Sequence, residues 1–353
     1  MKLLTVIGAR PQFVKAAVVS RALRPRAVEI LAHTGQHYDF NMSDIFFQEL
    51  GLPQPDYALG IGSGPHGSQT GKMLEAVENV LLKEKPDALL IYGDTNSTLA
   101  GALAAAKLHV PVAHVEAGLR SFNRRMPEEI NRVMADHLST WLFAPTQTAT
   151  QNLAAEGIRA GVHLVGDVMY DAFLLMSQTV QRHSRIVAEH RLAPRGYLLL
   201  TLHRAENTDD PARLGAIIDA VNQAEQPVVF PVHPRTAAKI REYGLTVNAA
   251  VVRMIEPVGY FDMLNLELHA KAVLTDSGGV QKEAYMAGVP CITLRDETEW
   301  VETVTARRNY LAGADPRAIQ TALALEWVSP EQPALFGDGK AAERIVDLLI
   351  GTT

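Results

Sequence analysis

Short apolar runs alternate with amphipathic segments along most of the chain. The first run, residues 3–7, ends at Gly8. A continuous run of this kind is typical of a parallel strand that is buried on both faces. Pro11 then stands where the first turn of a helix tolerates proline, and residues 13–23 have the apolar spacing of a helix. The chain therefore begins with a predicted strand–helix unit.

The same unit recurs in both halves of the chain. Further strands are predicted at residues 28–34, 88–92, 112–115, 142–144, 162–165, 197–202, 228–232, 251–255, 272–275 and 291–294. Further helices are predicted at residues 41–50, 68–83, 97–108, 127–138, 146–156, 211–224, 234–243, 260–270, 280–287 and 340–350. Residues 171–190 are helical without a strand, so we interpret them as a connector. Two sets of such units predict an α/β protein with two doubly wound parallel sheets.

Composition supports a folded protein of about two domains, at roughly 150 residues per domain. Of the 353 residues, 47% are hydrophobic and 20% are charged, which excludes a disordered chain. The formal net charge is −6, so the chain lacks the basic field that holds a phosphate polymer. Nucleic acid is therefore not predicted as a partner, whereas a small anion bound by a local cluster of Arg and His stays possible.

Membrane and disulfide signals are both missing. Residues 1–8 have no basic region before the apolar run, and no stretch of 18 apolar residues lacks charges, so neither a signal peptide nor a membrane partner is predicted. Cys291 is the single cysteine, which excludes an internal disulfide and fits a reducing compartment. We interpret it as a small buried apolar residue. The predicted location is the cytoplasm.

Polar residues follow the predicted strands. In parallel sheets, ligands bind beyond the carboxyl ends of the strands. Many residues at those ends are ionisable and lie next to glycine: residues 8–10, 35–37, 93–95 and 114–120 in the first half, and 203–204, 233–235, 276–279 and 295–297 in the second. The sequence thus predicts one polar edge on each sheet, and a ligand-binding cleft if the two edges face each other.

A phosphate site is one interpretation of Ser277-Gly278-Gly279, which opens a predicted helix. Glycines let a phosphate approach free N–H groups, and the helix dipole favours an anion. A simple helix cap is the alternative. Glu283, on the same helix, is either a ribose ligand or a solvated side chain. The chain has no dinucleotide fingerprint and no Gly-Lys-Ser/Thr triplet, which argues against NAD and ATP.

A metal site is not predicted, because the 12 histidines include no His-Glu-x-x-His pattern and there is no cysteine pair. His114 and Glu116 share one face of a predicted strand, and core packing explains His114 better than ligation does. His203, beside Arg204, is interpreted as a phosphate donor or an acid–base group, with structural capping as the alternative.

Three carboxylates in the first half are candidates for proton transfer. Asp94 and Glu116 end strands, and Glu128 starts a helix after Pro127. Carboxylates that lie together raise one another's pKa, which lets an acid and a base coexist at neutral pH. Helix capping is the alternative role for Glu128.

These motifs resemble the non-hydrolysing UDP-N-acetylglucosamine 2-epimerase family across nearly the whole chain. The resemblance is carried by residues 8–11 with Lys15, 93–95, 114–120, 127–129, 203–204 and 275–279 with Glu283. It implies two Rossmann-like domains in the B-type glycosyltransferase arrangement, with the active site between them. It also implies that the C-terminal helix returns to the first domain, so that residues 1–167 and 340–353 form one domain and residues 168–339 the other.

The resemblance also implies an activity and its residues. The family eliminates UDP from a UDP-2-acetamido sugar and adds it back with C2 inverted, as in the interconversion of UDP-N-acetylglucosamine and UDP-N-acetylmannosamine, without a cofactor. The predicted acid–base residues are Asp94, Glu116 and Glu128, together with His203. The predicted UDP ligands are Arg10, Lys15, His233, Ser277, Gly278, Gly279 and Glu283. The predicted sugar ligands are Arg120, Arg124, Arg125 and Arg295, and a homodimer is implied.

Within the family, the chain is most similar to the branch that acts on UDP-2,3-diacetamido-2,3-dideoxyglucuronate. The similarity lies in residues 121–126, 201–208, 281–283 and 298–302, and Lys282 stands where the common members carry an acid. Arg124 and Arg125 are adjacent cations that could hold a C6 carboxylate. They could equally point to solvent or pair with Glu129 and Asp136.

Two other functions are considered. A glycosyltransferase of the same architecture would need an acceptor pocket and a single base, so three carboxylates would be more than it uses. A two-domain protein that binds a sugar nucleotide without converting it would need none of them. An epimerase turns over a UDP-sugar with no acceptor, which separates the three functions.

Overall fold

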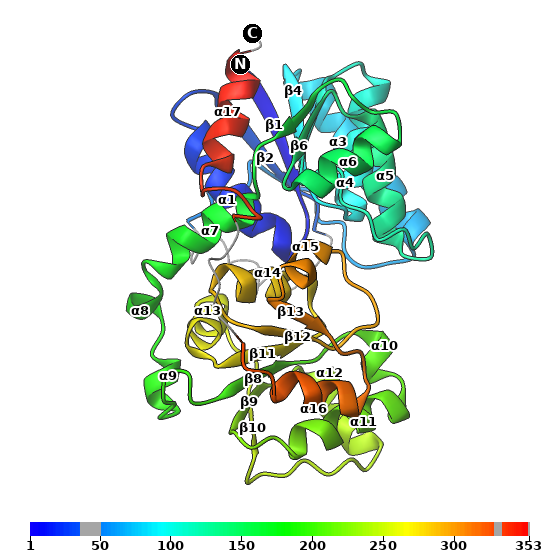
Figure 1. The fold of residues 1–353 in the computed structure, drawn as a ribbon. Coiled ribbons are helices and arrows are strands. Elements are labelled where there is room, and N and C mark those ends of the chain that lie inside the picture. The colour runs from blue at the N-terminus through cyan, green and yellow to red at the C-terminus, as the bar shows by residue number, and fades with distance from the viewer. Residues whose placement is uncertain (36–50, 328–333, 352–353) are drawn as a thin grey trace. The chain divides into compact units, whose positions relative to one another are not determined.

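The computed structural model describes residues 1–35, 51–327 and 334–351 and divides the chain into two compact units (Figure 1). The first unit comprises Met1–Ala172 with Ala334–Thr353, and the second comprises Phe173–Pro333. The predicted helix at residues 41–50 lies outside the described residues. Both units are built on parallel sheets, so the predicted α/β class is confirmed.

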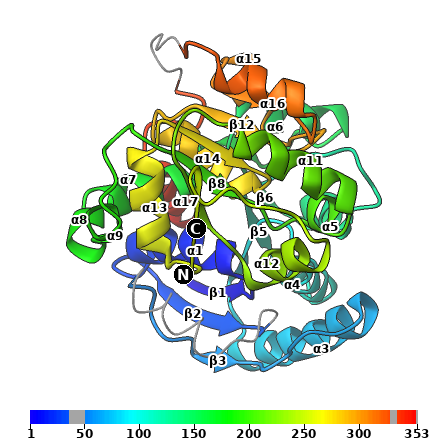
Figure 2. The ribbon, with the colours of Figure 1, turned by 90° about the horizontal axis from the view of Figure 1, so that it is seen from below.

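The first unit contains a seven-stranded parallel sheet of order β3-β2-β1-β4-β5-β6-β7 among the described residues. Its strands are β1 Lys2–Ile7, β2 Val28–His33, β3 Tyr57–Ala58, β4 Ala88–Tyr92, β5 Val112–Val115, β6 Trp141–Ala144 and β7 Val162–Leu164. Figure 2 shows β1, β2 and β3 side by side, as their pairing requires. Parallel pairing in register places the carboxyl ends of β1, β4 and β5 at one edge.

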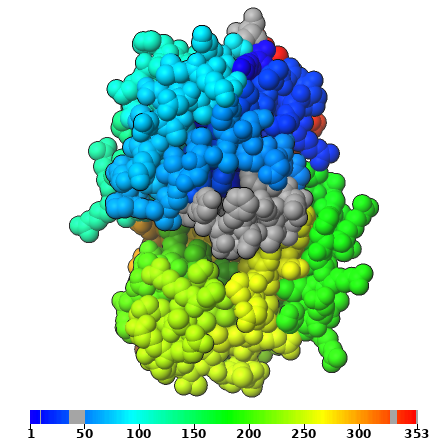
Figure 3. Space-filling view, turned by 180° about the vertical axis from the view of Figure 1, so that it is seen from behind, coloured from blue at the N-terminus to red at the C-terminus, as the bar shows by residue number. Residues whose placement is uncertain are grey.

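Helices cover both faces of this sheet. They are α1 Arg10–Leu23, α3 His66–Glu84, α4 Asn96–Lys107, α5 Pro127–Leu138, α6 Gln147–Ala155 and α17 Ala341–Gly351. α3, α4 and α5 pack in a row, and α3, sky blue in Figure 3, lies on the surface with Met73 and Val77 turned inward. The C-terminal helix α17 packs against α1, where Asp347 pairs with Arg26 at 2.5 Å.

The second unit contains a six-stranded parallel sheet of order β10-β9-β8-β11-β12-β13 among the described residues. Its strands are β8 Leu198–Thr201, β9 Val228–Pro231, β10 Val252–Ile255, β11 Ala272–Thr275, β12 Cys291–Thr293 and β13 Asn309–Leu311. Its helices are α8 Val180–His183, α9 Ile186–Glu189, α10 Ala205–Thr208, α11 Pro211–Asn222, α12 Pro234–Glu242, α13 Tyr260–His269, α14 Gly278–Met286, α15 Val301–Thr305 and α16 Pro316–Leu323.

Both faces of the central strands β8, β9 and β11 of the second sheet are buried. Leu198 and Leu200 pack into a cluster with apolar residues of α11 and α16, whereas Leu199 packs with residues of α13 and α14 on the other face. Side chains alternate along a strand, so a strand buried on both sides has no polar face. This is why the second half of the chain has continuous apolar runs rather than alternating ones.

The predicted elements differ from the observed ones in two ways. The connector at residues 171–190 is not one helix but three, because α7 Val168–Ser177 is followed by the short α8 and α9. Five short elements were not predicted: β3, α10, α15, β13 and α16. No described helix is long and apolar enough to cross a bilayer.

Candidate active site

The side chain of Gln12 connects the turn between β1 and α1 to the end of β4. Gln12 Oε1 accepts hydrogen bonds from the backbone N–H groups of Gly8 and Ala9, and its Nε2 donates to the Tyr92 carbonyl oxygen at 2.7 Å. The start of α1 is thereby held over the carboxyl end of β4. Lys15, one turn further along α1, points to the same edge as the residues that follow β4 and β5.

Glu116 follows β5 in a left-handed conformation with a φ of 74°. Such a conformation is uncommon for a residue other than glycine, and it clusters at functional sites. It persists here because the N–H groups of Glu116 and Ala117 both donate to the Phe143 carbonyl oxygen at 3.1 Å. The turn directs the Glu116 side chain back across the edge of the sheet.

Lys15 and Glu116 form a buried ion pair at this edge. Only 8% of the Lys15 side chain and 9% of the Glu116 side chain are exposed. Gly93 lies against the pair: a Cβ at this position would be 3.3 Å from Glu116 Oε2 and 3.4 Å from Lys15 Nζ. Gly93 also has a φ of 58°, so both the conformation and the space explain a glycine there.

Asp94 follows Gly93 and pairs with Arg132 of α5. Its backbone carbonyl oxygen accepts a hydrogen bond from Asn131 at 2.9 Å. Burial raises the pKa of the Asp94 carboxyl above its ordinary value, although the nearby Arg132 acts in the opposite direction. Glu116 raises this pKa as well and Lys15 lowers it, so the structure places Asp94, Glu116 and Lys15 within one electrostatic group.

His114, in β5, holds the backbone of Gly93, which lies against this group. Its Nδ1 lies 2.7 Å from Asp136 Oδ1, and its Nε2 lies 2.7 Å from the Gly93 carbonyl oxygen. Both ring nitrogens therefore face an acceptor oxygen. Asp136 also accepts from the Gly118 N–H and from Arg120. Burial acts to raise the pKa of Asp136, but the bonds from His114 and Arg120 outweigh it and hold the pKa below its ordinary value.

Glu128 is the second residue of α5, is exposed, and lies one helical turn before Arg132. The preceding loop, residues 121–126, is held by Glu129, which accepts hydrogen bonds from the N–H groups of Ser121 and Phe122, both at 2.9 Å. Glu129 binds this loop and Arg132, and Asp136 binds His114 and Arg120. Neither carboxylate therefore forms an ion pair with Arg124 or Arg125. Both arginines are exposed.

The second unit contains a matching polar edge after β8 and β11. Asp276 is fully buried and accepts hydrogen bonds from the N–H groups of His203 and Arg204, and from Asn207 Nδ2. His203 Nδ1 lies 3.1 Å from Asp276 Oδ1, and half of the His203 side chain is exposed. Burial acts to raise the pKa of Asp276, but the hydrogen bonds from His203 and Arg204 hold it below its ordinary value. Asp276 thus orients His203 with its other nitrogen available.

Ser277 precedes α14 as its N-cap without a side-chain cap bond. A simple capping role is therefore not what the Ser277 hydroxyl performs here. Gly278 and Gly279 form the first turn, where the backbone N–H groups have no partner within the helix. Glu283 lies on the same helix and is largely buried. Lys282 lies over the Trp300 ring at 4.2 Å from its centroid.

The remaining predicted residues are Arg120, Arg295, His233 and Arg10. Arg120 and Arg295 each have side chains only 1% exposed: Asp136 and Glu156 pair with Arg120, and Glu299 pairs with Arg295 at 3.0 Å. Their contact with a sugar stays a prediction. His233 is the exposed N-cap of α12 and accepts from the Arg235 N–H. Arg10 is the first residue of α1, and residues 36 and 37 lie outside the described residues.

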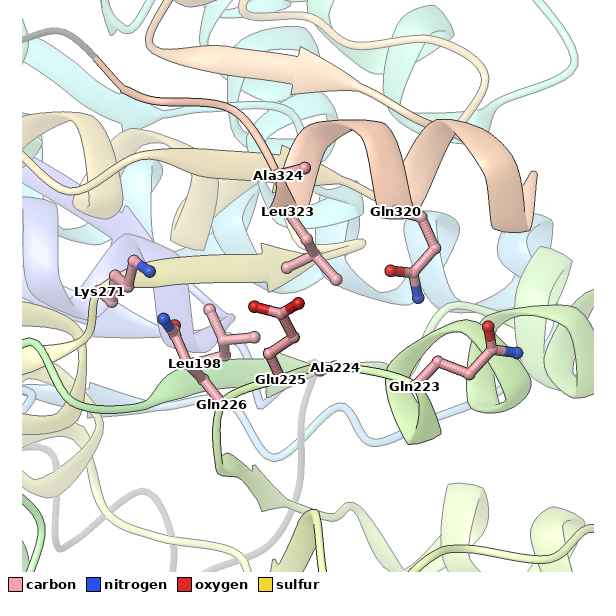
Figure 4. A pocket seen from close by; sticks show the side chains of 9 residues that line it. All are labelled: Leu198, Gln223, Ala224, Glu225, Gln226, Lys271, Gln320, Leu323 and Ala324. Atoms are coloured by element: carbon pink, nitrogen blue, oxygen red, sulfur yellow. The ribbon is translucent and has the colours of Figure 1, made fainter.

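Residues 256–259, which follow β10, were not predicted as part of the second polar edge. A hollow of about 700 Å³ lies beyond the carboxyl ends of β9 and β10, lined by Val232, Met254 and residues 255–259. The rule applied to the other strands, that ligands bind after their carboxyl ends, would have found it. The hollow in Figure 4 lies at the opposite edge, where Leu198 begins β8 and Lys271 precedes β11, and it contains no cluster of candidate catalytic residues.

The polar edge of the first unit suits proton exchange, and the polar edge of the second unit suits an anionic group. The first unit offers carboxylates beside a lysine, and the second offers a histidine and a helix N-terminus. Among the described residues, no group of His, Cys, Asp and Glu has a geometry that could hold a metal ion.

Comparison with known proteins gives a consistent result. The UDP-N-acetylglucosamine 2-epimerase family model matches residues 21–350. The chain is 52% identical to a UDP-N-acetylglucosamine 2-epimerase homolog of Methanococcus maripaludis, with 99% of each chain covered. It is also 52% identical to the UDP-2,3-diacetamido-2,3-dideoxy-D-glucuronate 2-epimerase of Pseudomonas aeruginosa, again over 99% of each.

A solved structure agrees with these sequence relatives. The Methanocaldococcus jannaschii UDP-GlcNAc 2-epimerase, in complex with UDP-GlcNAc and UDP, matches with a TM-score of 0.90 and 46% identity. The match covers 99% of this chain and 100% of that one. The epimerase of Neisseria meningitidis, bound to UDP-GlcNAc, matches with a TM-score of 0.89 and 30% identity, over 99% of this chain and 100% of its own.

Proposed function

The chain belongs to the UDP-N-acetylglucosamine 2-epimerase family, and on that premise we propose that it inverts C2 of a UDP-2-acetamido sugar without hydrolysing it. The observation that carries the proposal is the Lys15–Glu116 ion pair beside Asp94 at the edge of the first sheet. A proton acceptor, a proton donor and a cation are thereby held together. The predicted isomerase activity follows from the family.

The chemistry of the substrate requires such a group. The C2 proton of an acetamido sugar is not acidic, because no carbonyl carbon adjoins C2. Inversion by elimination removes the C2 proton, breaks the bond between C1 and the UDP oxygen, and leaves UDP and a glycal. Protonation of C2 on the opposite face and return of the UDP oxygen to C1 complete the reaction. No electron is gained or lost overall, so no oxidant is consumed.

The residues of the two units have different tasks in this proposal. Asp94, Glu116 and Glu128 move the C2 proton and hold the glycal. His203 and the helix N-terminus at Ser277 stabilise the departing diphosphate, as do Arg10, Lys15 and His233. Glu283 holds the ribose. Burial raises the pKa of the Asp94 carboxyl above its ordinary value, and the nearby Arg132 acts in the opposite direction.

The two alternative functions are not favoured. No acceptor is needed for the proposed reaction, and the relatives named above are epimerases rather than glycosyltransferases. A protein that only binds a sugar nucleotide would have no use for a strained Glu116 and a buried ion pair beside it. Strain of this kind costs about 1–3 kcal/mol and persists only where the surrounding structure holds it.

We propose UDP-2,3-diacetamido-2,3-dideoxyglucuronate as the preferred substrate. Support comes from the Pseudomonas aeruginosa relative, whose name carries that sugar, and from Arg124 and Arg125. Both arginines are exposed, and neither is paired with Glu129 or Asp136. An arginine can bind a C6 carboxylate with two parallel hydrogen bonds, whereas a neutral sugar offers no such partner.

The test is incubation of the purified protein with each UDP-sugar alone, with EDTA and without any acceptor. Proton NMR of the C1 and C2 signals separates the two epimers. We expect a new C2 epimer from at least one sugar and faster conversion of the uronate. If neither sugar changes while UDP still binds, the proposed activity is wrong and a binding function is favoured.

We also propose a homodimer in the cytoplasm. The family resemblance supports the dimer, and the single cysteine supports a reducing compartment. Light scattering coupled to size-exclusion chromatography measures the mass directly: a mass of about one chain would exclude the dimer.

A further inference from the structure

Arg132 joins two carboxylates that come from different parts of the first unit. It lies on α5 with only 7% of its side chain exposed. Its guanidinium pairs with Asp94, which follows β4, and its Nη1 lies 3.3 Å from Glu129 Oε2. A planar guanidinium presents several donors in a fixed fork, so it can contact two carboxylates at once.

Glu129 in turn holds the loop of residues 121–126. Its carboxylate is buried and accepts from the N–H groups of Ser121 and Phe122 and from Ser121 Oγ at 3.0 Å. Phe122 is 76% exposed and has a φ of 59°, a backbone conformation that costs free energy in an aromatic residue. The two backbone hydrogen bonds keep it there. The loop that carries Arg124 and Arg125 therefore depends on the Glu129 carboxylate.

Asp94 has three charged neighbours: Arg132 on α5, Glu116 after β5 and Lys15 on α1. Lys15 is already paired with Glu116. Arg132 is the cation that pairs with Asp94. On the same helix, Glu128 lies one turn before Arg132 and Glu129 lies three residues before it. The candidate proton-transfer residue and the candidate sugar loop are thus connected through one side chain.

We propose that Arg132 is a positioning residue that fixes the Asp94 carboxyl group in place and, through Glu129, couples it to the loop of residues 121–126. The inference rests on the proposed function only in treating Asp94 as a residue that exchanges a proton with the substrate. The contacts themselves are independent of that function.

The first test needs no substrate. Protein labelled with aspartate ¹³C at the carboxyl carbon is titrated by NMR, and the Asp94 signal is assigned by its loss in D94N. We expect R132M to raise the Asp94 midpoint by about 1–3 pH units, since an opposite charge at this distance shifts a carboxyl by that amount. R132K, which keeps the charge, should restore most of the difference. An Asp94 midpoint in R132M within 0.3 units of the unmodified protein overturns the proposal.

Amide hydrogen exchange tests the coupling to the loop. The N–H groups of Ser121 and Phe122 should exchange at least ten times faster in R132M, because the Glu129 carboxylate loses its cation. R24M is the matched control: Arg24 also pairs with a buried carboxylate of the first unit, Glu29, at 2.9 Å, and touches none of these residues. If the Ser121 and Phe122 amides exchange at the same rate in R132M as in R24M, the proposed coupling is wrong. R132Q must behave as R132M does, and it replaces R132M if that variant does not fold.

The activity test separates this inference from the proposed function. In kcat/KM against pH, the limb that belongs to Asp94 should move to higher pH in R132M, whether Asp94 acts as acid or base, because the pKa moves up in both cases. If the unmodified protein converts no UDP-sugar, the proposed function fails while the NMR titration still decides the role of Arg132. If the unmodified protein converts the sugar, but R132M shifts neither the Asp94 limb of the pH profile nor the Asp94 midpoint, the inference is wrong and the proposed function is unaffected.

Discussion

Replacing Asp136 by asparagine should destabilise the first unit strongly. Asp136 is fully buried and accepts three hydrogen bonds, from His114 at 2.7 Å, from Arg120 at 2.6 Å and from the Gly118 N–H at 3.0 Å. One of the donors, Arg120, is a buried cation. Asparagine has the same shape but turns an N–H₂ toward donors and removes the anion that pairs with the buried Arg120. Breaking a buried pair in this way costs about 3–5 kcal/mol, a large part of a typical stability of about 5–15 kcal/mol.

The pH dependence of this cost distinguishes charge from shape. The pKa of Asp136 is lowered in the folded protein, so its contribution is present above the unfolded value of about 4 and is lost as the pH falls through the folded value. The cost of D136N should therefore shrink between pH 7 and pH 3.

Urea unfolding measures how much D136N lowers the free energy of unfolding, provided that the tryptophan fluorescence comes from the first unit alone. The chain has three tryptophans, and a W300F/W327F background leaves Trp141 in β6 as the reporter. D347N is the matched control, since Asp347 is exposed and forms a surface pair with Arg26 that is worth less than about 1 kcal/mol. A D136N cost below about 1 kcal/mol at pH 7, or an equal cost at pH 3, would refute the role given to this carboxylate.

Three further predictions concern the site and the single thiol. Replacing each proposed proton-transfer carboxylate by its amide should lower kcat by roughly 100-fold or more with UDP affinity largely kept, as measured by steady-state kinetics and calorimetry on D94N, E116Q and E128Q; near-normal rates in two of them would contradict the assignment. Replacing Arg124 and Arg125 together by alanine should narrow the preference in kcat/KM for the uronate over UDP-N-acetylglucosamine by about 10- to 100-fold, the loss of one charge-assisted contact; an unmodified enzyme that prefers the neutral sugar would contradict the substrate proposal. Burial raises the pKa of the Cys291 thiol to about 12, so a thiol reagent at pH 8 should label it only on unfolding, and rapid labelling of the folded protein would disprove its burial.

The alternation of apolar runs and amphipathic segments was enough to predict both sheets, because the central strands, such as β4 and β8, are buried on both faces. The edge strands β3 and β13 were missed, since two or three residues form no run that a periodicity can detect. α16 had a signal that went unused: Asp315 caps it through the Arg317 N–H, and Pro316 occupies its first position. Short helices with good caps were therefore within reach of the sequence, whereas short edge strands were not.

The candidate site was predicted where the residue follows a strand, as Asp94 and Glu116 do. Its support on α5 was missed, because charged residues on an amphipathic helix usually face solvent. α5 has the opposite arrangement: it buries Arg132 and Asp136 and exposes Ile130 and Met134. Spacing shows which residues share a face of a helix, but only the packed structure shows which face is turned inward.

Solvent isotope incorporation tests the central claim, elimination and re-addition, most directly. The UDP-sugar that is turned over is incubated with the unmodified protein in heavy water, with no nicotinamide and with EDTA, and both epimers are analysed by proton NMR. The account predicts deuterium at C2 of the product epimer, formed at the rate of epimerisation, with free UDP and a glycal accumulating slowly on long incubation. Full epimerisation with the original proton retained at C2 would contradict it.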